Sequence, residues 1–141
     1  MSEELQVHAN YVGVWDASVP ATQTTGEINA NWVLKDRFVE QTGFLKNADG
    51  SISNVTTFLT YDQRRKVYRM ISFMSNGMIG EAEATWDPAT KTMTQVFRDP
   101  GVTTTMTGSF AEPGVEKWNM VATGADGKVL HQMSGTNTRR K

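Results

Sequence analysis

Residues 66–86 read KVYRMISFMSNGMIGEAEATW, and this stretch decides the fold. Its two halves, residues 66–74 and 78–86, both alternate between two faces with a period of two residues, as extended strands do. Between them stands Asn76-Gly77, a dipeptide typical of tight turns between antiparallel strands. The stretch therefore predicts a β-hairpin.

The same pattern of alternation and turn continues along most of the chain. Further strands are predicted at residues 14–19, 27–34, 37–44, 52–61, 91–98, 102–111, 116–123 and 128–138. Turn-forming residues such as Asp49-Gly50 separate them, and residues 2–12 are predicted as one short helix capped by Ser2. About ten short strands predict an all-β antiparallel meander, either a sandwich or an up-and-down barrel. Closure into a barrel of about eight to ten strands is favoured because it removes exposed edges.

Composition narrows the class of protein. The chain has 141 residues, with 18 Thr and 13 Val but only 5 Leu, and it suits a single domain spanning residues 1–141. The absence of cysteine excludes thiol catalysis and disulfides. A formal net charge of −1 argues against the basic face that nucleic-acid binding requires. No apolar run approaches the roughly 18 residues of a membrane span, so we expect a cytoplasmic protein without nucleic-acid or membrane partners.

Several short motifs resemble those of known β-barrels. Gly13-Val14-Trp15 is similar to the Gly-x-Trp signature that opens lipocalin-like barrels. Three further stretches resemble a bacterial family catalogued as domain of unknown function 1579, namely residues 35–41, Thr60-Tyr61-Asp62 with Lys66 and Tyr68, and residues 85–92. That family is calycin-like and distantly related to the nitrobindins. The resemblance spans roughly residue 13 to the C-terminus and implies a lipocalin-like β-barrel, with no established activity.

The resemblance also implies roles for two positions. Trp15 is expected to plug the closed end of the barrel, with Arg139 or Arg140 packed over its ring in a cation–π contact. Because the nitrobindins bind haem through a histidine on their last strand, His131 is a candidate axial ligand. The alternative for His131 is a hydrogen-bonded or partly exposed side chain.

Charged residues on two predicted strands leave alternatives open. Glu81 and Glu83 share a strand face, and if they pointed inward they would repel and one pKa would rise. The opposite face is more apolar, which favours an outward placement. Arg69 would lie inside the barrel if the Val67 face were inward, and would then need an acidic partner or an anionic ligand. We favour the arrangement in which the Tyr68 face lines the interior.

The interior of such a barrel has room for one small ligand, and methionine and aromatic side chains adapt to varied apolar shapes. We therefore predict a non-enzymatic protein that binds a small apolar or amphipathic molecule and needs no cofactor or metal. The expected lining residues are Trp32, Tyr68, Met70, Met74, Trp86, Met106, Trp118, Met120, His131 and Met133.

Two other functions use the same interior. One is an enzyme of the isomerase, cyclase or hydro-lyase type, with acid/base groups drawn from His131, Tyr68, Arg69 or Glu40. The other is haem binding through His131. A homodimer is compatible with this kind of barrel, and no residue pattern requires one.

Overall fold

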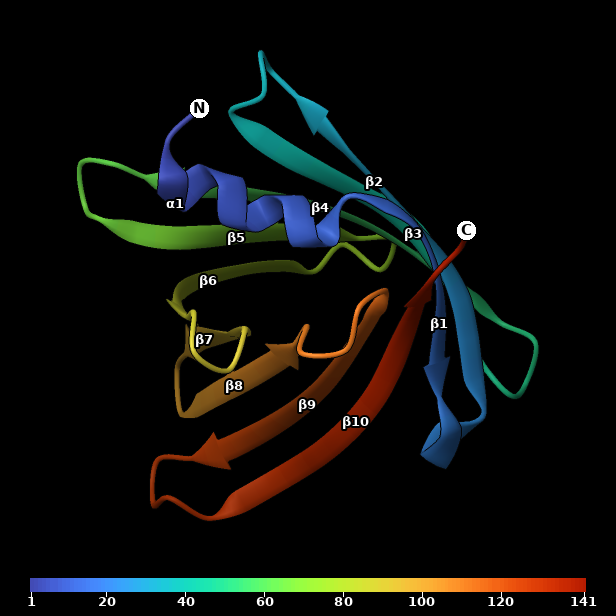
Figure 1. Cartoon of the computed structure of the whole chain (residues 1–141). Helices are drawn as coiled ribbons and strands as arrows, with labels where there is room; N and C mark the ends of the chain where they lie inside the picture. The colour runs from blue at the N-terminus through green and yellow to red at the C-terminus, as the bar shows by residue number, and fades with distance from the viewer.

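The computed structural model describes residues 1–141, and its ten strands form one closed antiparallel barrel (Figure 1). Each strand pairs with the next in sequence, and β10 returns to pair with β1. The prediction of an up-and-down barrel is therefore confirmed. The strands are β1 (Gly13–Val19), β2 (Thr24–Val33), β3 (Phe38–Lys46), β4 (Ile52–Asp62), β5 (Val67–Met74), β6 (Ile79–Asp87), β7 (Thr92–Asp99), β8 (Val102–Ser109), β9 (Val115–Gly124) and β10 (Val129–Arg139).

The N-terminal segment is less regular than the single helix expected over residues 2–12. It consists of α1 (Glu3–Gln6) followed by the 3-10 helix η1 (Val7–Tyr11), and it lies across one end of the barrel (Figure 1). Ser2 caps α1 as predicted, since its Oγ accepts from the Leu5 N–H at 3.1 Å. The Asn10 side chain donates to the Val7 carbonyl at 2.8 Å, and this local contact competes with a continuing α-helix. We call the covered end of the barrel the closed end and the opposite end the open end.

Alternation along each strand separates an inner face from an outer face. On β1, Trp15, Ala17 and Val19 are buried, and the antiparallel registers carry this inner face around the barrel. The main core lies at the closed end and consists of Tyr11, Trp15, Ala30, Val39, Leu59 and Phe110.

Trp15 has the structural role expected of it. Its indole N–H donates to the Tyr11 carbonyl at 2.8 Å, and the ring packs edge-on against Phe110. The guanidinium carbon of Arg139 lies 4.6 Å from the ring centroid, so Arg139 supplies the cation–π contact. The prediction for Trp15 is confirmed.

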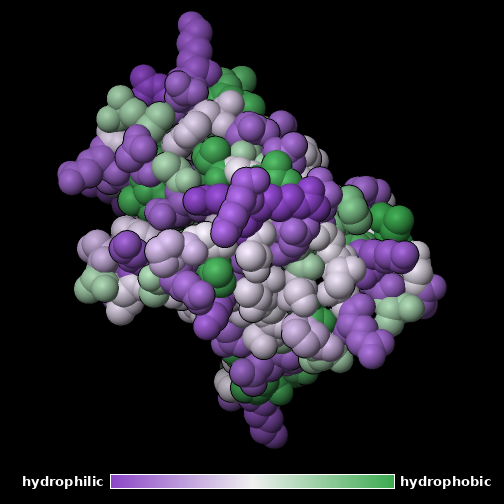
Figure 2. Space-filling model, turned by 45° about the vertical axis from the view of Figure 1, so that its right-hand side comes forward, coloured by the Kyte–Doolittle hydropathy of each residue, from purple (hydrophilic) through white to green (hydrophobic).

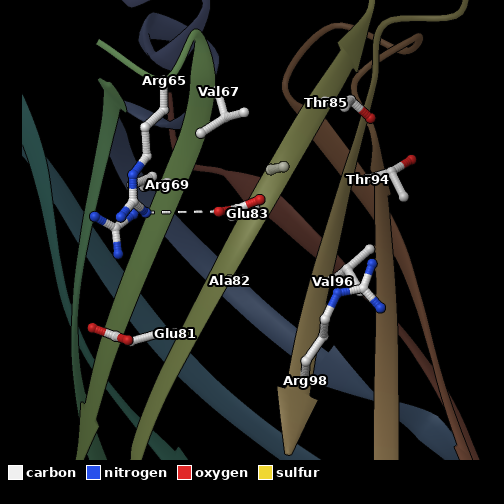
Figure 3. A pocket seen from close by; sticks show the side chains of 11 residues that line it. Arg65, Val67, Arg69, Glu81, Ala82, Glu83, Thr85, Thr94, Val96 and Arg98 are labelled. Carbon is white, nitrogen blue, oxygen red and sulfur yellow. Dashed lines mark ion pairs between the residues drawn. The ribbon is translucent and has the colours of Figure 1, made fainter. Parts of the chain in front are cut away.

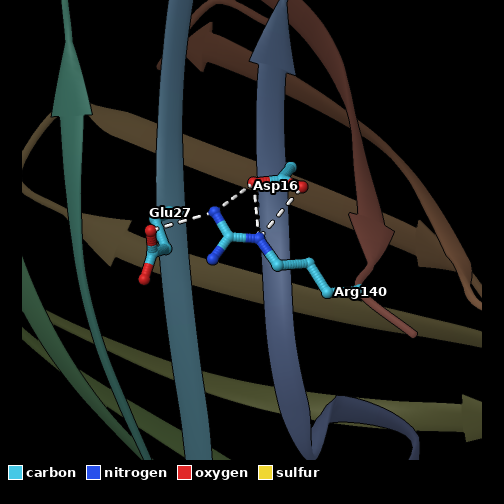
Figure 4. A network of polar contacts seen from close by, with 3 residues as sticks. All are labelled: Asp16, Glu27 and Arg140. Atoms are coloured by element: carbon cyan, nitrogen blue, oxygen red, sulfur yellow. Dashed lines mark hydrogen bonds and ion pairs between the residues drawn. The ribbon is translucent and has the colours of Figure 1, made fainter.

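Arg140 points to the outer face instead and connects the strands near the place where β10 meets β1 to close the barrel (Figure 4). Its guanidinium donates to Asp16 Oδ1 at 2.6 Å and to Glu27 Oε2 at 3.0 Å, and these two carboxylates face each other across β1 and β2. The hydrogen bond from Arg140 lowers the pKa of Asp16 below its ordinary value. The contact therefore links the chain just after β10 to β1 and to β2.

The outer surface is mixed in polarity, and hydrophobic residues appear on it as separate patches (Figure 2). The exposed large apolar side chains are Met1, Leu34, Phe44, Ile52, Phe73, Met74, Met78, Ile79, Val129 and Leu130. Leu34 ends the strand predicted over residues 27–34, but it lies in the turn after β2 and is 65% exposed. No helix is long and apolar enough to pass through a lipid bilayer.

His8, which lies in η1, is the most deeply buried polar side chain of the protein. It is 1% exposed, its Nε2 lies 3.0 Å from the Thr60 carbonyl, and its ring meets Tyr68 edge-on. Because that carbonyl can only accept, Nε2 carries the proton, and Nδ1 is left buried without a hydrogen-bond partner. Burial lowers the pKa of His8, partly offset by the hydrogen bond to Thr60.

This burial predicts a loss of stability in mild acid. The pKa of His8 is lower in the folded chain than the ordinary value of 6.5, so the unfolded chain binds the extra proton first. The free energy of unfolding should therefore fall as pH drops below about 6.5 and through the folded pKa. Urea unfolding at pH 7 and pH 5 should show a smaller decrease for His8→Gln than for the wild type. The exposed-site variant His131→Gln should keep the full decrease, and equal pH dependence in both variants would contradict the assignment.

Candidate functional site

Inward-facing side chains differ in burial between the two ends of the barrel. The buried core gathers at the closed end, whereas Met106, Met120 and Met133 face inward on β8, β9 and β10 and are only half-buried. Trp32, Met70 and Trp86 near the closed end are also half-buried, but they pack against the core, which Met106, Met120 and Met133 do not. The interior next to these three methionines is the candidate binding site.

A row of methionines forms the wall of this site. Met106 pairs with Met120, and Met120 pairs with Met133, so the three side chains project side by side from neighbouring strands. We call these three residues the methionine row. Unbranched, polarizable thioether side chains repack around ligands of different shape. The row therefore offers an adaptable apolar surface.

Trp118 lies one inward position closer to the closed end than Met120, between glycines on both neighbouring strands. It pairs with Gly108 and with Gly135. A Cβ at Gly135 would lie 2.5 Å from Cζ2 of the indole, so the ring occupies the space over the bare Gly135 backbone. A side chain at position 135 would therefore displace the indole.

Glu116 is the next inward residue on β9, and sequence reasoning did not single it out. Asn137 on the paired strand donates its Nδ2 to Glu116 Oε1 at 2.9 Å. A Cβ at Gly108 would lie 2.5 Å from Oε2, so the carboxylate rests over that glycine. Burial raises the pKa of Glu116 to about 6, against the opposing hydrogen bond from Asn137. The signal was present in the sequence, because Glu116, Trp118 and Met120 alternate along one predicted strand.

All ten predicted lining residues belong to the inner face, but they lie at different heights in the barrel. Trp118 and the methionine row form one wall of the candidate site. At the open rim, Met74 and His131 are exposed. Three residues pack against the closed-end core, namely Trp32, Met70 and Trp86, and Tyr68 is buried beside His8. The ligand-binding role of each stays a prediction.

The charged residues of β3, β5 and β6 face outward. Tyr68 is buried, so its neighbour Arg69 points away from the interior, as favoured above. Glu81 and Glu83 alternate with buried Ala82 and Ala84, which confirms their outward placement. Glu40 likewise follows the fully buried Val39. The expectation that Arg69 or Glu40 supplies acid/base chemistry inside the barrel is therefore wrong, because strand parity directs both outward.

A second concave region lies on the outer face of β5, β6 and β7 (Figure 3). It is a shallow polar groove of about 520 Å³, in which Arg65 lies 3.8 Å from Glu83. The Arg69 Nε in this groove is shielded from solvent and has no hydrogen-bond partner. The remaining lining residues are Val67, Glu81, Ala82, Ala84, Thr85, Thr94, Val96 and Arg98. Its lining mixes charges of both signs with the apolar side chains of Val67 and Val96, whereas the methionine row is wholly apolar.

Metal and haem binding receive little support from the geometry. The structure contains no group of three or more His, Asp or Glu side chains that could hold a metal ion. His131 pairs with Ala122 next to a register shift in β10 and is exposed at the open rim. Haem ligation through His131 stays a prediction.

Comparison with known proteins identifies the architecture. No protein-family model matches the chain, and no curated protein sequence matches it. The chain is similar to the structure of the S-type phycobiliprotein lyase CPES from Guillardia theta, with a TM-score of 0.68 and 15% identity over 100% of this chain and 94% of that one. It is also similar to the crystal structure of Rv2717c from M. tuberculosis, with a TM-score of 0.72 and 12% identity over 100% and 99% of the two chains.

These similarities agree with the class of fold, which is a lipocalin-like up-and-down β-barrel. At 15% and 12% identity they show the fold alone. The narrower resemblance to domain of unknown function 1579 finds no matching family model and stays a prediction.

Proposed function

We propose that residues 1–141 form a single binding domain that holds a small apolar or amphipathic molecule in the open half of the barrel. The observation that carries the proposal is the methionine row, whose side chains face inward and yet remain accessible to solvent. In a barrel with a fully packed interior, these side chains would be buried as Leu59 and Met93 are. Apolar walls with a few placed polar groups are typical of small-molecule sites.

The architecture is compatible with this role. One of the two similar structures is named a phycobiliprotein lyase, and a small molecule such as a bilin would be a ligand of the proposed kind. Closed-end packing also supports it, because the cluster around Trp15 makes a rigid base on which the open half can stay unfilled. A preformed site of this kind binds without a large ordering cost.

The proposal predicts saturable binding of an uncharged apolar probe. N-Phenyl-1-naphthylamine fluoresces weakly in water and strongly in apolar surroundings, so its emission should rise to a plateau on titration with the protein. Native mass spectrometry should show one probe molecule bound per chain. Emission that increases linearly without saturation, or a protein that carries no probe in the mass spectrum, would contradict the proposal.

A second candidate, an enzyme that uses the same interior, is favoured by one observation. Glu116 is an interior carboxylate whose raised pKa of about 6 suits general acid/base work near neutral pH. The compound that Glu116→Gln retains after purification separates the two functions when it is extracted and incubated with a catalytic amount of the wild type. An enzyme should change the proton NMR spectrum of that compound, whereas a binding protein should leave the spectrum unchanged.

A further inference from the structure

The carboxylate of Glu116 is incompletely partnered. Asn137 donates one hydrogen bond to Oε1, and no protein group donates to Oε2, which lies over the bare backbone of Gly108. An ionised carboxylate can accept about four hydrogen bonds, so Oε2 keeps acceptor sites that no protein group fills. A ligand in the neighbouring interior therefore finds an acceptor ready to be used.

No basic side chain of the barrel forms an ion pair with this carboxylate. Arg139 is the inward-facing cation nearest along β10, two positions beyond Asn137. Its Nη2 donates to the Asn10 carbonyl at 2.8 Å and its guanidinium stacks on Trp15, while its Nε is buried without a hydrogen-bond partner and donates nothing to Glu116. Lys117, the basic neighbour of Glu116 on β9, points outward and lies 3.8 Å from Glu112. The charge of Glu116 is thus left for a ligand to neutralise.

Glu116 and the apolar wall are arranged like the two ends of an amphipathic molecule, one polar and one apolar. Along the inner face of β9 the order from the closed end is Glu116, Trp118 and Met120, which places a polar group at the base and apolar groups toward the open end. A ligand that enters with its head first would bring that head to Oε2 and its apolar body against the methionine row.

We propose that Glu116 is the specificity-determining residue of the interior site and selects amphipathic ligands that carry a protonated nitrogen head group. This inference rests on the proposed binding function. A charged nitrogen donor forms a charge-assisted hydrogen bond with Oε2 and neutralises the carboxylate, whereas a carboxylate head of the same length is repelled. The site therefore discriminates by the head group, while the methionine row accepts apolar bodies of varied shape.

Octylammonium and octanoate test the inference, because they share one apolar chain and differ in head-group charge. Each competes with N-phenyl-1-naphthylamine at pH 8, where Glu116 is ionised because its pKa is about 6. Wild-type protein should bind octylammonium about ten- to a hundredfold more tightly than octanoate, the range expected for one hydrogen bond to a charged group. Glu116→Gln keeps the shape of the side chain and should remove the preference.

Two further variants separate charge, position and fold. Glu40→Gln removes the same charge from the outer face of β3 and should keep the full preference. Gly108→Ala keeps the charge, but its Cβ would lie 2.5 Å from Oε2 and displace the carboxylate, so the preference should shrink. Equal binding of the two amphiphiles to the wild type, or a preference that survives in Glu116→Gln, would overturn the inference while leaving probe binding intact. If the uncharged probe itself fails to bind, the proposed function is overturned as well.

Discussion

Trp15→Ala should lower the free energy of unfolding by about 3–5 kcal/mol, the range for removing a large aromatic side chain from a core. Trp15 is 3% exposed and belongs to the closed-end cluster. Its loss also leaves the Tyr11 carbonyl without the indole donor and Arg139 without the ring beneath its guanidinium. For a domain of ordinary stability, this change removes a large fraction of the total.

Urea unfolding followed by far-UV circular dichroism measures this effect without depending on tryptophan emission. Leu130→Ala is the matched control, because Leu130 is 60% exposed on β10 and should change stability by no more than about 0.5 kcal/mol. A Trp15→Ala protein as stable as Leu130→Ala would show that the closed end does not carry the fold.

Met120→Asp should weaken binding of the uncharged probe by about a hundredfold or more. Met120 is the central member of the methionine row, so the change removes apolar contact area worth about 1.5–3 kcal/mol for a fully covered side chain. An apolar ligand would also strip water from the new carboxylate without replacing its hydrogen bonds. Because water reaches this interior in the free protein, the carboxylate stays hydrated there and the fold should persist.

Val121→Asp is the matched control for this prediction. Val121 is the next residue on β9 and faces outward between Thr105 and Gln132. Its substitution by Asp introduces the same charge at almost the same height along the barrel axis. Its affinity for the probe, measured by the same fluorescence titration, should stay close to that of the wild type. Equal losses in both variants would indicate binding on the outer face or a general loss of structure.

Much of the fold could be predicted because the period-two alternation and the turn residues are local signals. The β5–β6 hairpin around Asn76-Gly77 forms as expected, with the Met74 N–H donating to the Met78 carbonyl at 3.0 Å. The inner face of β6 was also predictable, since Ala82 and Ala84 alternate with two glutamates. On β5 both faces carry apolar groups, so parity alone left Arg69 undecided.

The candidate site was predictable only in part, because a strand pattern gives the face of a residue but not its height along the barrel axis. Trp32 and Met106 both face inward, yet the first packs on the closed-end core and the second lines the open interior. Height depends on how the strands are staggered around the closed barrel, which no single strand encodes. Glu116 was overlooked because an acidic residue on a strand ordinarily faces water.

A ligand bound inside the open half of the barrel is detected by methionine methyl NMR, because the side chains of the methionine row would touch it. The eight methionines of the chain can be labelled together with ¹³C at their ε-methyl groups. Met93 is buried at the closed end and Met78 is 60% exposed in a turn outside the barrel, so these two residues serve as internal controls.

With N-phenyl-1-naphthylamine bound, the methyl groups of Met106, Met120 and Met133 should show intermolecular NOEs to the aromatic protons of the probe. Met78 and Met93 should show none. NOEs confined to Met78, or a bound probe that gives no NOE to Met106, Met120 or Met133, would place the ligand outside the barrel and contradict the proposed function.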